Sequence, residues 1–183
     1  MMQLQTGRPA SDAGRLPREI RVYDALDAMG IPYERIDHAP ADTMEVCRAI
    51  DDALGTLICK NLFLCNRQKT KFFLLMMPGD KVFKTRELTP QIGAGRLSFG
   101  DPEDLLRLLD TLPGAVSVMG LLNDPEGVVT LLVDEDVLAG ETLGCHPCVS
   151  TSSLKLKTSD VFERFVPATG HRFTKIRLEG AEA

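Results

Sequence analysis

Hydrophobic residues recur along the chain at two spacings, and these spacings predict where its helices and strands lie. The apolar positions within residues 16–29 follow the period of an α-helix, and Gly30 supplies a C-terminal stop. A second helical pattern runs from an N-cap at Asp42 to a stop at Gly55. Residues 31–37, between the two helices, are predicted to form a short strand.

Two dense apolar runs, residues 57–64 and 71–77, are typical of buried strands and are predicted to pair as a hairpin. Beyond the hairpin we expect helices at residues 85–92, from residue 101 onward and from residue 158 to near Gly170, and strands at residues 115–119, 128–133, 153–157 and 173–178. Because hairpins and crossovers are both present, the expected fold class is a mixed α/β (α+β) fold, with helices packed on a mixed sheet, not a doubly wound parallel sheet.

The length of 183 residues fits one domain. Residues 1–15 are polar and lack an apolar signal-peptide core, so we expect a flexible lead-in followed by a single domain over residues 16–183, ordered from Leu16. No stretch of 18 uncharged apolar residues occurs, and we therefore expect no membrane partner.

Charge and cysteine content narrow the function classes. The formal net charge of −5 indicates that any contact with nucleic acid is local. Residues 67–86 carry six basic side chains and one acidic one, and this basic run is either a solvated face or a local binding surface. The odd number of five cysteines, without an export signal, predicts reduced thiols and a cytoplasmic location.

Lys60 stands inside an otherwise apolar strand pattern. Burying an unpaired lysine costs several kcal/mol, so the residue either extends from an edge strand to water or lies at the mouth of a cleft. In a cleft, it could bind a phosphate or polarise a carbonyl group. The pattern alone leaves both interpretations open.

Gly120 ends a predicted strand and opens a polar loop that reaches Gly127. A glycine at a strand end allows the backbone to approach a ligand closely, and a plain turn is the alternative.

The segment Cys145-His146-Pro147-Cys148 has the spacing of half a zinc site or of a redox motif. No second pair lies at a useful spacing, and a Ser/Thr run follows where a redox motif needs a helix, so both interpretations are disfavoured. The chain also has no serine-hydrolase elbow, P-loop or dinucleotide fingerprint. We therefore expect no metal and no cofactor.

Four blocks occur together in a recognisable order: CKNLFL at 59–64, GAGRLSFG at 93–100, LPGAVSVMGLLND at 112–124 and CHPCVSTSSLKL at 145–156. With these blocks the chain resembles the YbaK / prolyl-tRNA editing domain family over roughly residues 16–178, and within it the free-standing PrdX/ProX-type deacylases. The resemblance implies a mostly antiparallel mixed sheet surrounded by helices. It also implies hydrolysis of the ester between an amino acid and the 3′ end of tRNA, most often alanine misattached to proline tRNA.

The resemblance places the family's essential lysine at Lys60, its glycine loop at Gly120 and its His-Pro at His146 and Pro147. These imply catalytic roles for Lys60, Gly120 and His146, in which a water attacks the ester, N–H groups of the Gly120 loop stabilise the oxyanion and Lys60 binds the terminal phosphate. The expected substrate-binding residues are Asn61, Arg96, Ser117, Met119, Leu121, Pro147, Ser150 and Thr151. The expected partners are the tRNA acceptor end, held by the basic run and Arg96, and transiently prolyl-tRNA synthetase.

One departure from the family pattern affects the expected specificity. Family members often carry Asn-Thr-x-Thr or Asn-Asp-x-Thr after His-Pro, whereas this chain has serine at position 150. Serine is shorter and lacks the amide group, which affects the contact with the substrate amino acid, and cysteine is an alternative to alanine as the amino acid that is removed. Two further alternatives are a non-catalytic relative that binds aminoacyl-tRNA in a regulatory role, and a zinc or redox protein built on Cys145 and Cys148.

Overall fold

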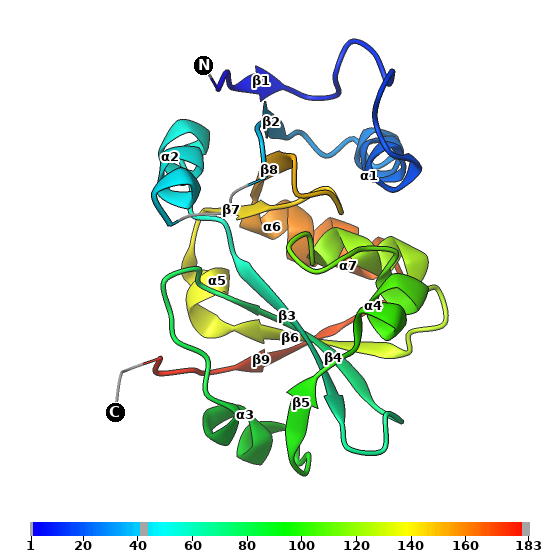
Figure 1. Ribbon diagram of the computed structural model, residues 1–183, viewed down its shortest axis with the longest axis vertical. Helices are drawn as coiled ribbons and strands as arrows, with labels where there is room; N and C mark the ends of the chain where they lie inside the picture. The colour runs from blue at the N-terminus through cyan, green and yellow to red at the C-terminus, as the bar shows by residue number, and fades with distance from the viewer. Residues whose placement is uncertain (1, 41–43, 181–183) are drawn as a thin grey trace.

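The computed structural model describes residues 2–40 and 44–180, which form two β-sheets with helices packed around them (Figure 1). The strands are β1 (Gln5–Thr6), β2 (Glu34–Asp37), β3 (Lys60–Asn66), β4 (Phe72–Met77), β5 (Leu97–Phe99), β6 (Val129–Asp134), β7 (Thr142–Cys145), β8 (Ser152–Lys157) and β9 (Phe173–Ile176). The α-helices are α1 (Pro17–Ala28), α2 (Met44–Leu54), α3 (Thr85–Ile92), α4 (Pro102–Leu109), α5 (Glu135–Ala139), α6 (Thr158–Asp160) and α7 (Val166–Ala168). A 3₁₀ helix, η1 (Val118–Asn123), and a π-helical turn, η2 (Val161–Phe165), complete the set.

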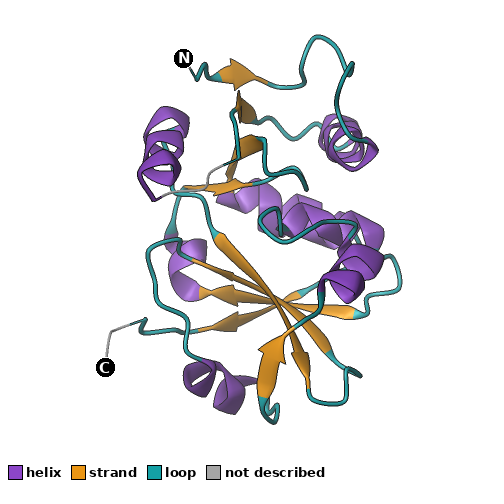
Figure 2. Cartoon of the chain, in the orientation of Figure 1, coloured by secondary structure: helices purple, strands orange, loops and turns teal. Residues whose placement is uncertain are grey.

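The larger sheet has the order β5-β3-β4-β6-β9 and occupies the lower half of Figure 2. β3 pairs antiparallel with β4 and β5, which confirms the predicted hairpin, and β6 pairs parallel with β4 and β9. The sheet is therefore mixed, and the α+β class expected from the sequence is confirmed.

The central strand β4 is buried along its whole length because both faces of the sheet are covered. Successive side chains of a strand point to opposite faces. Phe72, Leu74 and Met76 accordingly join a core beneath α1, α4 and η1, which we call core one. Phe73, Leu75 and Met77 join a smaller core beneath α3, which we call core two.

The smaller sheet is antiparallel, with the order β1-β2-β8-β7, and α1 and α2 lie on either side of it (Figure 1). The two sheets join where the N–H of Cys59 donates to the carbonyl of Gly144 at 2.9 Å and the N–H of Gly144 donates to the carbonyl of Leu57 at 3.0 Å. The last residues before β3 are thereby connected to β7.

The N-terminal segment has more structure than a flexible lead-in. β1 pairs with β2, and Gln5 bonds to Arg35, whose side chain is buried. Order thus begins before Leu16, where we expected it to start. The division of the chain at residue 15 stays a prediction.

The strand predicted at residues 115–119 is wrong. The N–H of Ala115 closes a turn onto Leu112, and the Ser117 hydroxyl accepts a hydrogen bond from Met119 N–H at 3.1 Å, which caps η1. A side-chain acceptor of this kind favours a helical start over an extended strand. The sequence pattern also missed β1, β5, α5 and β7. The predicted N-cap at Asp42 lies outside the described residues.

Candidate active site

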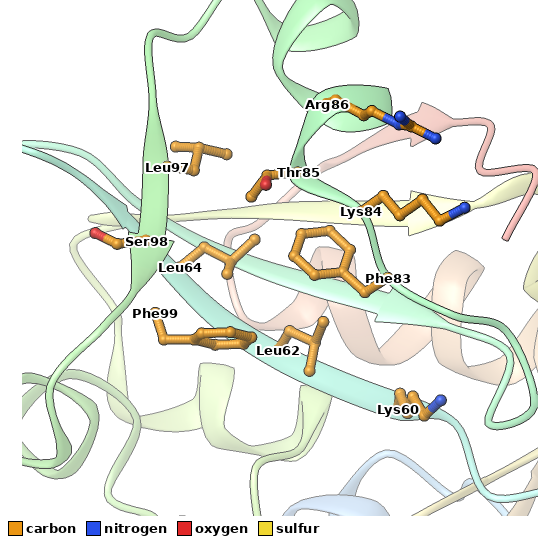
Figure 3. Close-up of a pocket in the computed structure, with 10 residues that line it drawn as sticks. All are labelled: Lys60, Leu62, Leu64, Phe83, Lys84, Thr85, Arg86, Leu97, Ser98 and Phe99. Carbon is orange, nitrogen blue, oxygen red and sulfur yellow. The ribbon is translucent and has the colours of Figure 1, made fainter. Parts of the chain in front are cut away.

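Lys60 is the first residue of β3, and its exposed side chain lies at the mouth of a cavity (Figure 3). Its Nζ donates to the carbonyl of Lys81 at 2.7 Å. Within residues 2–40 and 44–180 no carboxylate lies within ion-pair distance of Lys60. The ammonium charge is therefore held by a backbone dipole and is not neutralised, which leaves it able to attract an anion.

The cavity has a volume of about 790 Å³, within the range of small-molecule sites, roughly 300–1,000 Å³. The cavity lies at the solvent-exposed edge of core two. Leu62 and Leu64, which lie on the same face of β3 as Lys60, belong to or pack against this core. We call it the Lys60 cleft and define it by its lining residues: Lys60, Leu62, Leu64, Phe83, Lys84, Thr85, Arg86, Leu97, Ser98 and Phe99.

The basic run of residues 67–86 does not form one surface. Lys69 pairs with Asp101, and Lys81 pairs with Asp134 at 2.9 Å and with Asp136. Lys84 and Arg86 line the Lys60 cleft, as seen in Figure 3. Arg96 is exposed just before β5 and is not a lining residue of the cleft.

The three predicted catalytic residues, Lys60, Gly120 and His146, are close in sequence to residues that come together in core one. Cys59 precedes Lys60, Cys145 precedes His146, and Ser117 caps the helix that contains Gly120. Cys145 lies beside Cys59 and hydrogen-bonds to Ser117, and burial raises the pKa of its thiol. The start of β3, the start of η1 and the end of β7 thus converge at the junction between the two sheets.

Gly120 lies inside η1 and not at a strand end. Its N–H already donates to the carbonyl of Ser117 at 3.0 Å. A Cβ atom at this position would lie 2.9 Å from the carbonyl oxygen of Leu109, so only glycine fits. This geometry supports a packing role, and the oxyanion role remains a prediction that would require the turn to open.

Met119 and Leu121 are fully buried in core one, as is the Ser117 hydroxyl that caps η1. Met119 borders a space of only about 10 Å³ next to Gly120, which is barely enough for one water molecule. In this structure these side chains therefore do not wall an open pocket for an amino acid. Their contact with substrate stays a prediction.

His146 belongs to a polar cluster at the end of the smaller sheet. Its Nδ1 donates to the carbonyl of Ser152 at 2.9 Å, and burial lowers the pKa of the imidazole. The Ser153 hydroxyl lies 3.4 Å from this same Nδ1 and 2.8 Å from Nε2 of His38. The other ring nitrogen of His38 lies 2.8 Å from the carbonyl of Ala39, which fixes it as the donor and leaves Nε2 to accept from Ser153.

The sequence reasoning missed His38 and Ser153, which lie 115 positions apart. A hydroxyl bonded to an oriented imidazole resembles an activated nucleophile. Ser153, however, is fully buried, which favours a positioning role for this pair. Only the position of Ser153 at the end of the Ser-Thr-Ser-Ser stretch could have drawn attention to it.

The other predicted binding residues are spread around the same junction. Pro147 is buried, Ser150 is half-buried, and Thr151 is exposed with its carbonyl bonded to His38 N–H. Asn61 donates to the carbonyl of Cys59 at 3.1 Å, and its side-chain oxygen has no hydrogen-bond partner within the described residues. The structure therefore brings His146, Ser150 and Thr151 to one loop and leaves Arg96 outside both this loop and the lining of the Lys60 cleft.

The cysteines have the environment of structural thiols. Burial raises the pKa of both Cys59 and Cys148 to about 12, and a thiol with a raised pKa is a poor nucleophile and metal ligand. Among the described residues no group of three or more His, Cys, Asp or Glu side chains is placed to hold a metal ion. The geometry thus gives no support to the zinc or redox alternative.

Fold and site together define a class of protein: an α+β domain with an uncompensated lysine at an apolar cleft, suited to binding an anionic substrate. The chain belongs to the aminoacyl-tRNA editing domain family, whose sequence profile matches residues 38–163. It is therefore an aminoacyl-tRNA deacylase, a hydrolase that acts on tRNA carrying an amino acid.

The relatives support this membership. The prolyl-tRNA editing protein ProX of Acetoanaerobium sticklandii is 31% identical over 157 residues, which cover 86% of this chain and 95% of that protein. The mouse prolyl-tRNA synthetase associated domain-containing protein 1 is 30% identical and covers 80% of this chain and 88% of its own.

Solved structures share the fold. A candidate trans-editing enzyme for prolyl tRNA synthetase superposes with a TM-score of 0.63 at 16% identity, covering 89% of this chain and 98% of that one. The hypothetical protein APE2540 also gives 0.63, at 17% identity over 86% of this chain and 98% of its own. None of the helices within residues 2–40 and 44–180 has the length and apolar character to cross a membrane.

Proposed function

We propose that this chain removes alanine from mischarged proline tRNA, with Lys60 as the anchor for the terminal phosphate. The observation that carries the proposal is the uncompensated charge of Lys60 at the mouth of an apolar cleft. The names of the bacterial and mouse relatives both refer to prolyl-tRNA or its synthetase and support proline tRNA as the substrate. Proline tRNA, a transient contact with prolyl-tRNA synthetase and a cytoplasmic location are parts of this proposal.

The chemistry needs no strong nucleophile, because the ester between an amino acid and a ribose is already activated. A water molecule attacks the carbonyl carbon, and the ribose 2′-hydroxyl helps to position it. The bond between that carbon and the ribose 3′ oxygen then breaks, the 3′ oxygen leaves with a proton that comes from the water, and the free amino acid is released. The Lys60 ammonium group binds the adjacent phosphate or the negative charge that develops on the carbonyl oxygen. His146, oriented by the Ser152 carbonyl, shapes the polar side of the site.

Such a deacylase is needed because a synthetase discriminates only weakly against amino acids that are smaller than its own substrate. A synthetase pocket that holds proline rejects a smaller amino acid by only about 1–3 kcal/mol per missing methylene. A second site that admits small amino acids and excludes proline corrects the resulting errors.

The first test is a deacylation panel with Ala-, Cys- and Pro-charged proline tRNA. We expect fastest release from Ala-tRNA and none from Pro-tRNA. Preferential release of cysteine would correct the specificity, in line with the serine at position 150. No release from any of the three would favour the non-catalytic tRNA-binding alternative.

The second test replaces the anchor. Lys60→Ala should lower kcat/KM for Ala-tRNA by about 100-fold or more, the usual effect of losing one group that stabilises a transition state. Lys175→Ala on β9 is the matched control, since it removes an exposed lysine from the opposite edge of the same sheet. Near-normal kcat/KM in Lys60→Ala would refute the assignment.

A further inference from the structure

Lys81 makes two contacts that connect the Lys60 cleft to a buried ion pair. It lies in the loop between β4 and α3, and its backbone carbonyl accepts the hydrogen bond from Lys60 Nζ at 2.7 Å. Its own ammonium group lies 2.9 Å from a carboxylate oxygen of Asp134 and 2.7 Å from one of Asp136. The reaction at Lys60 does not by itself explain the ion pair.

The ion pair is largely buried and connects distant segments. The Asp134 side chain has no exposed surface, and 16% of the Lys81 side chain is exposed. Lys81 Nζ also donates to the carbonyl of Leu178, in the segment that follows β9. The end of β6, the start of α5 and this C-terminal segment are thereby connected to the loop that contains Lys81. Because separating a buried charge from its partner is strongly unfavourable, the loop is fixed at this point.

The same loop packs closely against the residue pair that precedes Lys60. Gly79 approaches Ile58 so closely that a Cβ atom would lie 2.5 Å from the Ile58 carbonyl oxygen. The N–H of Lys81 closes a turn by donating to the carbonyl of Pro78 at 3.2 Å. Packing on one side and the ion pair on the other therefore determine where the Lys81 carbonyl lies.

The hydrogen bond to this carbonyl restrains Lys60 without occupying it fully. A lysine ammonium group has three N–H donors. One is used by the Lys81 carbonyl and limits the rotation of a long, flexible side chain, so two donors remain for a substrate. Holding a group in place before the substrate binds matters for the rate, since a displacement of about 1 Å can cost roughly 100-fold.

We propose that Lys81 is a positioning residue for deacylation: its ion pair with Asp134 fixes the carbonyl that directs the Lys60 ammonium group toward the substrate. This inference rests on the proposed role of Lys60. Lys81 acts through Lys60 and not on the substrate itself, because its ammonium group is already occupied by two carboxylates and a backbone carbonyl.

The test removes both charges of the buried pair together. Lys81→Met alone would leave the Asp134 carboxylate buried without its partner and destabilise the fold, so the variant is Lys81→Met/Asp134→Asn. Asparagine keeps the side-chain oxygen that accepts from Asp136 N–H and caps α5. Lys155→Met/Glu34→Gln is the matched control, because it removes a partly exposed lysine ion pair between β8 and β2.

Deacylation kinetics give the first readout. We expect Lys81→Met/Asp134→Asn to lower kcat/KM for Ala-tRNA about 10-fold, and the control to leave it near the wild-type value. In a Lys60→Ala background the same two substitutions should have no further effect, since a positioning residue acts only through the group that it positions. A merely structural role would lower the rate equally in both backgrounds. That result, or an unchanged kcat/KM, would overturn the inference.

Acylation of Lys60 separates this inference from the proposed function. After treatment with trace acetic anhydride, mass spectrometry compares the labelling of Lys60 with that of Lys157, an exposed lysine on β8, in the same sample. An amine held by a hydrogen bond reacts more slowly, so Lys81→Met/Asp134→Asn should raise this ratio about threefold or more. An unchanged ratio contradicts the inference even where Lys60→Ala abolishes deacylation. Retained activity in Lys60→Ala refutes the proposed role of Lys60, whereas the ratio still decides whether the ion pair holds its side chain.

Discussion

At the scale of single residues, Lys60 and Gly120 are important to the site for different reasons. Within the described residues the Lys60 ammonium group has a carbonyl and not a carboxylate as its partner, so no opposite charge compensates it. Position 120 needs a glycine because η1 passes so close to the carbonyl of Leu109 that a side chain would clash with it. The first residue is a candidate for chemistry, and the second is explained by packing alone.

Gly120→Ala should therefore destabilise the fold. The added methyl group would lie 2.9 Å from the Leu109 oxygen, and overpacking of this kind costs about 1–3 kcal/mol. Urea unfolding measures the loss. Gly95→Ala is the control, since a Cβ atom there meets nothing within 4 Å. Wild-type stability together with lost deacylation in Gly120→Ala would instead support a role in the reaction.

At the scale of elements, hydrophobic spacing in the sequence predicted those helices and strands that depend on neighbouring residues in the chain. The β3–β4 hairpin and α3 follow from dense apolar runs and helical spacing. η1 was mistaken for a strand, because its side chains are apolar and the capping bond of Ser117 is not visible in a hydrophobic pattern. β1 was missed since its two residues are polar and pair only with β2.

β1 should contribute measurably to stability. Deleting residues 2–7 removes the hydrogen bond from Gly7 N–H to Tyr33, 2.8 Å long, and the Gln5 partner of the buried Arg35. We expect a loss of about 1–3 kcal/mol, because a buried donor is left unsatisfied. Deleting residues 2–4, which stops short of β1, is the control. Unchanged stability in the longer deletion would restore the flexible lead-in that we first expected.

At the scale of the whole molecule, two cores lie on opposite faces of the larger sheet, and β4 supplies both. Core one reaches up to the smaller sheet through Tyr23 on α1 and Leu154 on β8. Core two ends at the Lys60 cleft. The candidate site thus lies where a packed core opens to solvent, between β3, β5 and the start of α3.

This arrangement predicts one cooperative unit. Leu74→Ala in core one and Leu75→Ala in core two should each cost about 2–5 kcal/mol, since both side chains are fully buried. The chain has two tyrosines and no tryptophan, and Tyr23 stacks on Tyr33 beside the smaller sheet. Urea unfolding followed by tyrosine fluorescence and by far-UV circular dichroism should shift together in both variants. If Leu75→Ala shifted only the dichroism signal, the two ends would unfold separately.

The sequence by itself determined the fold class, the hairpin that carries Lys60 and the family, because these depend on hydrophobic period and on blocks of neighbouring residues. Only the tertiary structure decided that Lys81 is neutralised by Asp134 while Lys60 is not, and that Ser153 links His38 to His146. It also decided that the Gly120 N–H is already engaged and that Phe99 lies exposed against the Phe83 ring in the Lys60 cleft. The physical reason is that charge compensation, hydrogen bonding and exposure depend on partners far away in the chain, which no local pattern encodes.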